Sequence, residues 1–155
     1  MPDYPHLLHT VLDTTDCRGL AEFYRELLGL QYRPGDEPPA DGPDEADWLV
    51  LTDAEGRRML AFQQVSSLTP TTWPDHDVPM QLHLDMTVPD VEELEAQRER
   101  ALALGATQVL DRADDEDWLV LTDADGVRKL AFQHVERLER TTSSSSTSRC
   151  SCTST

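Results

Sequence analysis

One segment of nineteen residues occurs twice in this chain, and this repeat constrains the fold more than any other feature. Residues 47–65 read DWLVLTDAEGRRMLAFQQV, and residues 117–135 read DWLVLTDADGVRKLAFQHV. The segments are identical at fifteen of nineteen positions, at a constant offset of 70 residues. A match of this length marks a duplicated structural unit. We therefore expect two small modules that share a core within the 155 residues.

Each copy of the repeat is typical of two strands joined by a tight turn. Apolar runs flank the sequence Asp-Ala-Glu/Asp-Gly in both copies. Gly56 and Gly126 can supply the positive φ that such a turn needs. The repeat therefore predicts one β-hairpin in each module.

The same order of elements precedes each hairpin. A strand at residues 7–12 is followed by a helix that Asp16 caps and that Gly29 ends. In the second half, a strand at residues 81–86 precedes a helix that Asp90 caps and that runs to Leu104.

Short strands complete the pattern and set the expected organisation of the chain. They lie at residues 29–33 and 107–110. The fold class is therefore α+β, with two tandem βαβββ modules. We expect the first module at 6–65, a linker at 66–79, the second module at 80–138 and a disordered tail rich in Ser and Thr at 139–155.

Charge and composition exclude several kinds of partner. Thirty acidic residues stand against thirteen basic ones, which gives a formal net charge of -17. Binding to a phosphate backbone or an anionic membrane needs clustered Lys and Arg, which this chain lacks, so we expect no nucleic-acid and no membrane partner. We expect no signal peptide and no membrane-spanning helix. Three scattered cysteines do not form a disulfide framework, so a cytoplasmic location is expected.

Several segments resemble one known superfamily. They are TVLDTTD at 10–16, AEFYRELLGL at 21–30, TWPDHDVPMQLHLDMTV at 72–88, LALGAT at 102–107 and LAFQ in each repeat. Together with the duplicated module they are similar to the vicinal oxygen chelate superfamily of glyoxalases, bleomycin-resistance proteins and extradiol dioxygenases. Within it, the segments resemble glyoxalase-like domains of uncharacterised bacterial proteins, over about residues 6–135. The resemblance implies two curved mixed sheets paired around a cavity, with the helices outside.

The resemblance also implies where a divalent metal would lie. In that superfamily His, Glu or Gln side chains from the first and last strand of each module hold the ion, and the first-strand positions match His9 and His83. The last-strand positions fall within 59–65 and 129–135, which contain Gln but no Glu. A divalent cation in a partly desolvated site prefers anionic ligands. We therefore expect no tight metal site, with His9 and His83 as the ligands if a metal is bound.

Strand parity selects the remaining candidate residues, because successive side chains of a strand point to opposite faces. Leu82, Leu84 and Met86 form an apolar row that should pack under a helix, which leaves His83 and Asp85 on the opposite face. The same alternation places His9 and Asp13 on one face of the first strand, toward the cavity. In the last strands Gln63 and Gln133 would face the cavity, whereas a slip of one residue would place Gln64 and His134 there instead. The candidate ligand-binding residues are His9, Asp13, Trp48, Gln63, His83, Asp85, Trp118 and Gln133.

Three functions are compatible with this pattern. The first, which we prefer, is a protein that binds a small organic molecule in the cavity without a tight metal site. The second is a metal-dependent lyase, isomerase or dioxygenase acting on vicinal oxygens, in which the metal polarises the oxygens and a carboxylate moves a proton. The third is a non-catalytic vestigial or interaction protein. No catalytic residue can be assigned from the sequence, and a homodimer remains open.

Overall fold

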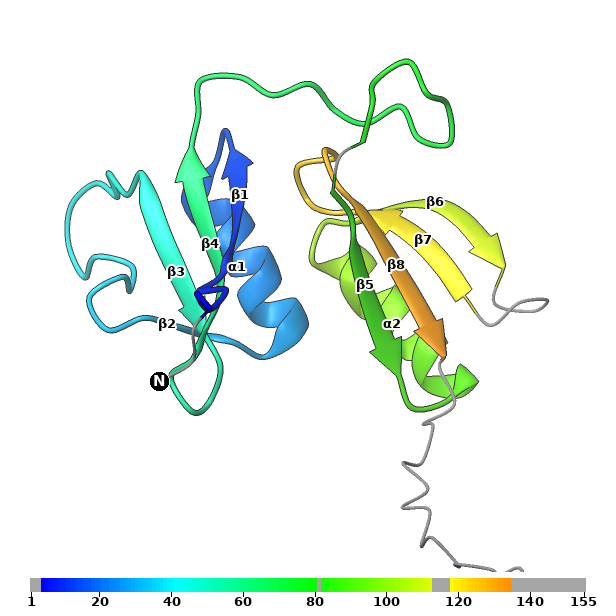
Figure 1. Cartoon of the computed structure of the whole chain (residues 1–155), viewed down its shortest axis with the longest axis horizontal. Coiled ribbons are helices and arrows are strands. Elements are labelled where there is room, and N and C mark those ends of the chain that lie inside the picture. Colours follow the sequence, from blue (N-terminus) through cyan, green and yellow to red (C-terminus); the bar gives the residue numbers. More distant parts are fainter. Residues whose placement is uncertain (1–3, 81, 113–117, 135–155) are drawn as a thin grey trace, which may run out of the picture.

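Two modules of the same architecture lie side by side in the computed structural model (Figure 1). It describes residues 4–80, 82–112 and 118–134. The first module comprises β1 (Thr10–Thr14), α1 (Cys17–Leu28), β2 (Gln31–Tyr32), β3 (Trp48–Thr52) and β4 (Arg58–Gln64). The second comprises β5 (Leu84–Val88), α2 (Val91–Ala103), β6 (Thr107–Arg112), β7 (Trp118–Thr122) and β8 (Lys129–His134).

Each module forms a four-stranded mixed sheet of the same topology. The strand orders are β1-β4-β3-β2 and β5-β8-β7-β6. The first strand of each module pairs in parallel with the last, and the remaining pairs are antiparallel. The duplicated α+β fold predicted from the repeat is confirmed.

Helix α1 begins and ends where the sequence predicts. The Asp16 side chain accepts a hydrogen bond from the Gly19 backbone N–H at 3.0 Å. Gly29 follows the last turn in the left-handed conformation, with φ 65°, which a residue without a Cβ adopts at little cost. In the second module, Asp90 caps α2 in the same way through the Glu93 backbone N–H.

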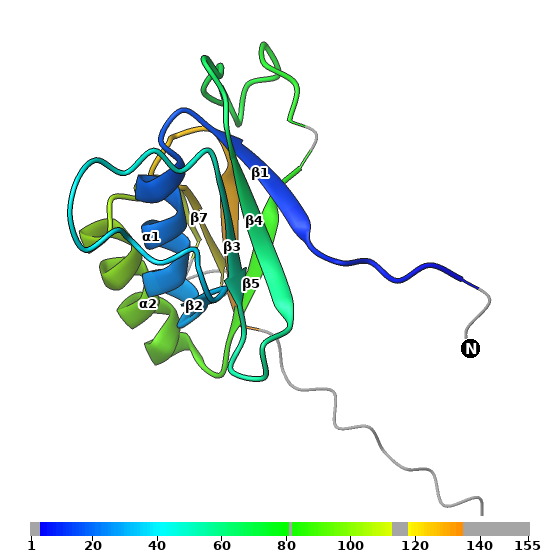
Figure 2. The same ribbon diagram turned by 90° about the vertical axis from the view of Figure 1, so that its left-hand side faces the viewer.

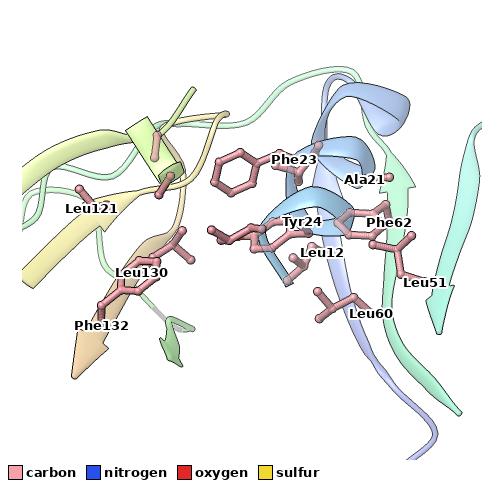
Figure 3. Packing of buried hydrophobic residues seen from close by; sticks show 14 of the residues in the cluster. Leu12, Ala21, Phe23, Tyr24, Leu51, Leu60, Phe62, Leu121, Leu130 and Phe132 are labelled. Atoms are coloured by element: carbon pink, nitrogen blue, oxygen red, sulfur yellow. The ribbon is translucent and has the colours of Figure 1, made fainter. Parts of the chain in front are cut away.

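Both helices cover the same side of the two sheets, and the opposite side of each sheet carries no helix (Figure 2). The buried apolar residues form one cluster drawn from both modules. Phe23 and Tyr24 of α1 lie between the first sheet and Leu130 of the second (Figure 3). The two modules therefore share a core.

A hairpin of the second module also docks onto the first through polar contacts. We call residues 123–128, which join β7 to β8, the docked hairpin. The buried Tyr24 hydroxyl donates to the Asp123 carboxylate at 2.8 Å, and Arg128 pairs with the same carboxylate at 3.1 Å. The Thr14 hydroxyl donates to Asp125 at 2.6 Å. Arg128 also donates to the backbone carbonyl of Asp13.

The first strand of each module starts later than the sequence predicts. β1 begins at Thr10, where its pairing with Leu60 of β4 begins, and β5 begins at Leu84, opposite Leu130 of β8. The apolar side chain of Leu82 is 43% exposed because it precedes the strand, so its expected place in the core was wrong. The predicted disordered tail lies outside the described residues.

Candidate functional site

The side of each sheet without a helix carries the predicted polar residues, and we call it the open face. In β1 the side chains of Leu12 and Thr14 are buried under α1, whereas Val11 and Asp13 are exposed on the open face. Asp13 lies opposite Gln63 of β4 in the strand register. The parity predicted for β1 is therefore confirmed.

Trp48 joins this group from the neighbouring strand. It lies opposite Gln63 in the register of β3 and β4. Its ring centroid is 6.1 Å from that of His9, with 54° between the ring planes, and 36% of the residue is exposed. His9 Nδ1 is buried and has no hydrogen-bond partner among the described residues. The first module therefore presents an aromatic surface beside an acid, an amide and an imidazole.

The second module repeats the arrangement in part. Asp85 and Thr87 are exposed on the open face of β5. His83 Nε2 lies 3.3 Å from an Asp85 carboxylate oxygen. Gln133 lies opposite Thr87 of β5 and Trp118 of β7 in the register. The Trp118 and His134 side chains lie outside the described residues.

The structure shows whether Gln63 or Gln64 lies on the open face of the first module, which the sequence left open. Leu60 and Phe62 are buried under α1, which places Ala61 and Gln63 on the open face. Gln64 accepts a hydrogen bond from the Cys17 backbone N–H at 2.8 Å and donates to the Thr15 carbonyl at 2.6 Å. Gln64 therefore fastens the start of α1 to β4, and the slip of one residue is wrong there.

The two acids do not occupy equivalent positions in the modules. Asp13 lies opposite Gln63, whereas the residue opposite Gln133 is Thr87. Asp85 lies opposite Ala131, so its counterpart in the first module is Val11. The glutamines are therefore at equivalent positions in the two modules, and the acids are not.

One contact near the second open face was not predicted. The Lys129 ammonium lies 4.9 Å from the centroid of the Trp73 ring, within the range of a cation–π contact. Lys129 shares its parity with Ala131 and Gln133, and Trp73 belongs to the segment between the modules. The only signal for this contact in the sequence was the presence of an aromatic residue, Trp73, in the linker at 66–79.

Cys17 is a structural thiol. It is 2% exposed and lies against the Phe62 backbone carbonyl, 3.5 Å from Sγ. Burial raises the pKa of the Cys17 thiol to about 11, so at neutral pH the group is protonated and a poor nucleophile.

The open face differs from the enclosed cavity that the resemblance implies. Four surface pockets border other parts of the described structure, and none of the eight candidate residues lines them. Within residues 4–80, 82–112 and 118–134, no three His, Cys, Asp or Glu side chains come together in a group that could hold a metal ion. Neutral Gln amides on the last strands add no anionic ligand. The described donor set does not fit a tightly held divalent metal.

This duplicated fold with its polar open face agrees with a family assignment. A family model described as a glyoxalase-like domain matches residues 9–132. The chain belongs to this glyoxalase-like family, within the vicinal oxygen chelate superfamily. No curated protein matches the chain.

Solved structures of the same fold include several proteins of this superfamily. A glyoxalase/bleomycin resistance protein/dioxygenase family enzyme from Burkholderia phytofirmans PsJN is 16% identical, with a TM-score of 0.59, over 83% of this chain and 97% of that one. The fosfomycin resistance protein FosX from Listeria monocytogenes is 16% identical, with a TM-score of 0.59, over 88% of this chain and 96% of that one. A variant of FosX, 19% identical with a TM-score of 0.57 over 88% of this chain and 95% of that one, was solved with Mn(II) and 1S,2S-dihydroxypropylphosphonic acid. At these identities the likeness shows the fold.

No helix in the part of the chain that the structure describes has the length and apolar character needed to span a membrane.

Proposed function

We propose that this protein binds a small organic molecule on its open face without a tightly held metal ion. One observation carries the proposal. An exposed Trp48 ring lies beside His9, Gln63 is opposite Trp48 in the strand register, and Asp13 is on the other side of Gln63. An aromatic surface with a few polar groups suits a planar ligand, because the ring supplies contact area and the polar groups orient the ligand.

The second module would supply the other side of the binding surface. Asp85 and Gln133 belong to β5 and β8, which correspond to β1 and β4, and His83 directly precedes β5. Trp118 completes the set by its register position opposite Gln133. The ligand would thus contact both halves of the duplication.

Metal chemistry is the second candidate function. The FosX variant with Mn(II) supports it, since that protein has the same fold. A lyase, isomerase or dioxygenase activity of this chain would use His9 and His83 as ligands. Against it stands the donor chemistry, because the last strands offer Gln amides where an anionic ligand is needed.

The deciding experiment titrates Zn²⁺, Ni²⁺, Mn²⁺ and Fe²⁺ into chelator-treated protein by calorimetry. The comparison is a variant that combines His9→Ala with His83→Ala. We expect no submicromolar binding by either protein. Tight binding that disappears in the variant would replace the proposal with the metal-dependent enzyme.

A screen of small aromatic and heterocyclic compounds by ligand-observed NMR tests binding itself. We expect hits whose line broadening is lost in Trp48→Ala and retained in Trp73→Ala. The second variant is the control for the loss of an indole ring, since Trp73 contacts Lys129 and is not one of the candidate residues. Hits that survive Trp48→Ala would place the ligand elsewhere.

A further inference from the structure

The end of β1 holds an arginine side chain of the other module. The Arg128 guanidinium of the docked hairpin donates to the backbone carbonyl of Asp13 and pairs with the Asp123 carboxylate at 3.1 Å. Arg128 is only 7% exposed, and a buried charge is costly unless it is paired and hydrogen-bonded. A carbonyl at the end of a first strand, with a carboxylate beside it, therefore forms a site for a guanidinium group.

The strand register identifies the equivalent position in the second module. Thr10 of β1 and Leu84 of β5 lie opposite Leu60 and Leu130, which are equivalent in the repeat. The first strands therefore correspond at an offset of 74 residues, and the caps of the two helices have the same offset. Because β1 and β5 run in opposite directions, the two equivalent positions lie at opposite ends of the boundary between the modules (Figure 1).

At this offset the Asp13 carbonyl corresponds to the carbonyl of Thr87. Thr87 lines an open pocket of 430 Å³, which we call the boundary pocket, formed by the ends of β5 and α1, one face of α2 and Phe132 of β8. A pocket of this volume can take a small organic molecule. The boundary pocket therefore occupies, in the second module, the position that the docked hairpin fills in the first.

The sequences of the two helices explain both the space and its chemistry. Phe23, whose ring faces the second module (Figure 3), corresponds to Gln97, which lines the boundary pocket. Gly19 corresponds to Glu93, which adds a carboxylate to the lining. The Thr87 carbonyl and the Glu93 carboxylate are thus the same two kinds of acceptor that hold the guanidinium in the first module.

The charged groups of the lining favour a cationic ligand. The positive group, Arg100, donates to the Leu27 carbonyl at 3.0 Å and to the Glu26 carbonyl, so its guanidinium is committed to the end of α1. The negative group, Glu93, accepts a hydrogen bond from the neutral Gln97 amide at 2.6 Å and makes no ion pair with Arg100 among the described contacts. A cation that enters the pocket would therefore find Glu93 as its partner, in a chain with a net charge of -17.

We propose that the boundary pocket binds a small molecule that carries a guanidinium group on an apolar body. The planar guanidinium donates to the Thr87 carbonyl and pairs with the Glu93 carboxylate, as its fork of N–H groups allows. The body packs against Leu28, Met86 and Phe132, which supply the apolar part of the lining. None of the eight candidate residues of the open face lines this pocket, so the proposal is independent of the proposed function.

The test is a titration of the ¹⁵N-labelled full chain with benzylguanidine, followed by amide chemical shifts. The matched probe is benzylurea, which has nearly the same shape and no charge. We expect saturable shifts at Thr87, Glu93 and Gln97 with benzylguanidine. Benzylurea should bind at least about tenfold more weakly, because hydrogen bonds to charged groups are the stronger ones.

Three variants locate the site. Glu93→Gln should weaken benzylguanidine binding by about tenfold, since the carboxylate becomes neutral. Glu92→Gln is the matched control, because it removes the same charge from a neighbouring exposed residue outside the pocket, and it should bind as the wild type does. Gln97→Phe restores the aromatic ring that α1 has at Phe23 and should fill the pocket and abolish binding. Thermal melts establish that the variants fold.

The same measurements can overturn the proposal. Equal affinities for benzylguanidine and benzylurea would exclude recognition of the charge. Shifts that occur at Asp13 and Asp85 and not at Glu93 would place the guanidinium on the open face. Binding that Glu93→Gln leaves unchanged, or the absence of saturable shifts at millimolar benzylguanidine, would exclude the site.

Discussion

The Tyr24 hydroxyl belongs to one module and the carboxylate that it contacts belongs to the other. Asp123 is 1% exposed and Tyr24 is fully buried. We expect Tyr24→Phe to lower the free energy of unfolding by about 1–3 kcal/mol, because Asp123 would lose one of its partners in a desolvated position. Denaturant unfolding measures the change. Tyr32→Phe, which removes a half-buried hydrogen bond to Glu22 within one module, should cost less. Equal losses of unfolding free energy in both variants would show that the hydrogen bond between the modules stabilises the protein no more than the one within a module.

The contact of the docked hairpin with the first module also depends on pH, through the Asp125 carboxyl. Partial burial, opposed by the Thr14 hydrogen bond, raises the pKa of the Asp125 carboxyl above its usual 3.8. An acid whose pKa is higher in the folded state contributes stability that is complete below 3.8 and is lost as pH rises through the raised value. The melting temperature of Asp125→Asn relative to wild type should therefore increase from pH 4 to pH 7. A difference that is constant or decreases over this range would contradict the assigned shift.

At the scale of single elements, the end of α1 depends on one backbone conformation. Gly29 has φ 65°, and no atom lies within 4 Å of the position that a Cβ would take. We expect Gly29→Ala to cost about 1–2 kcal/mol through backbone strain alone, since the left-handed region is unfavourable for Ala. Gly29→Asn should cost less because Asn tolerates this region. Thermal unfolding distinguishes the two variants, and an equal loss would point to a cause other than φ.

The sequence predicted the helices of this fold better than it predicted the starts of its strands. Asp16 and Gly29 mark the ends of α1 by local chemistry that needs no partner. A strand such as β1 begins only where another strand pairs with it, and this partner is fifty residues away in the sequence, as Thr10 and Leu60 show. The alternation of side chains along a strand predicted that Asp13 and Asp85 lie on the side away from the helix, but their unequal positions in the two modules depend on the strand register. The buried pair of Asp123 and Arg128 was missed because the first copy of the repeat has the same residues, Asp53 and Arg58, at the corresponding positions.

At the scale of the whole molecule, the shared core makes each module depend on the other. Phe23 and Tyr24 belong to α1 but face the second module (Figure 3). A module of about sixty residues is marginal in size, and it would expose this surface if expressed alone. We expect residues 1–70 to give a poorly dispersed amide spectrum as a monomer. A well-dispersed spectrum of a monomer would contradict the shared core.

The near-identity of the two last strands has a consequence for the path by which the chain folds. β4 and β8 carry the same LAFQ sequence, and each pairs in parallel with a first strand through equivalent positions. The backbone ladder of β1 would therefore accept β8 almost as well as β4, and only side-chain packing under each helix favours the native partner. Mispaired species of this kind are characteristic kinetic traps of duplicated chains. Refolding should show a slow phase that diminishes when the LAFQ segment of β8 is replaced by a different apolar sequence of similar volume. Because of the duplication, each first strand therefore has two last strands that compete to pair with it during folding.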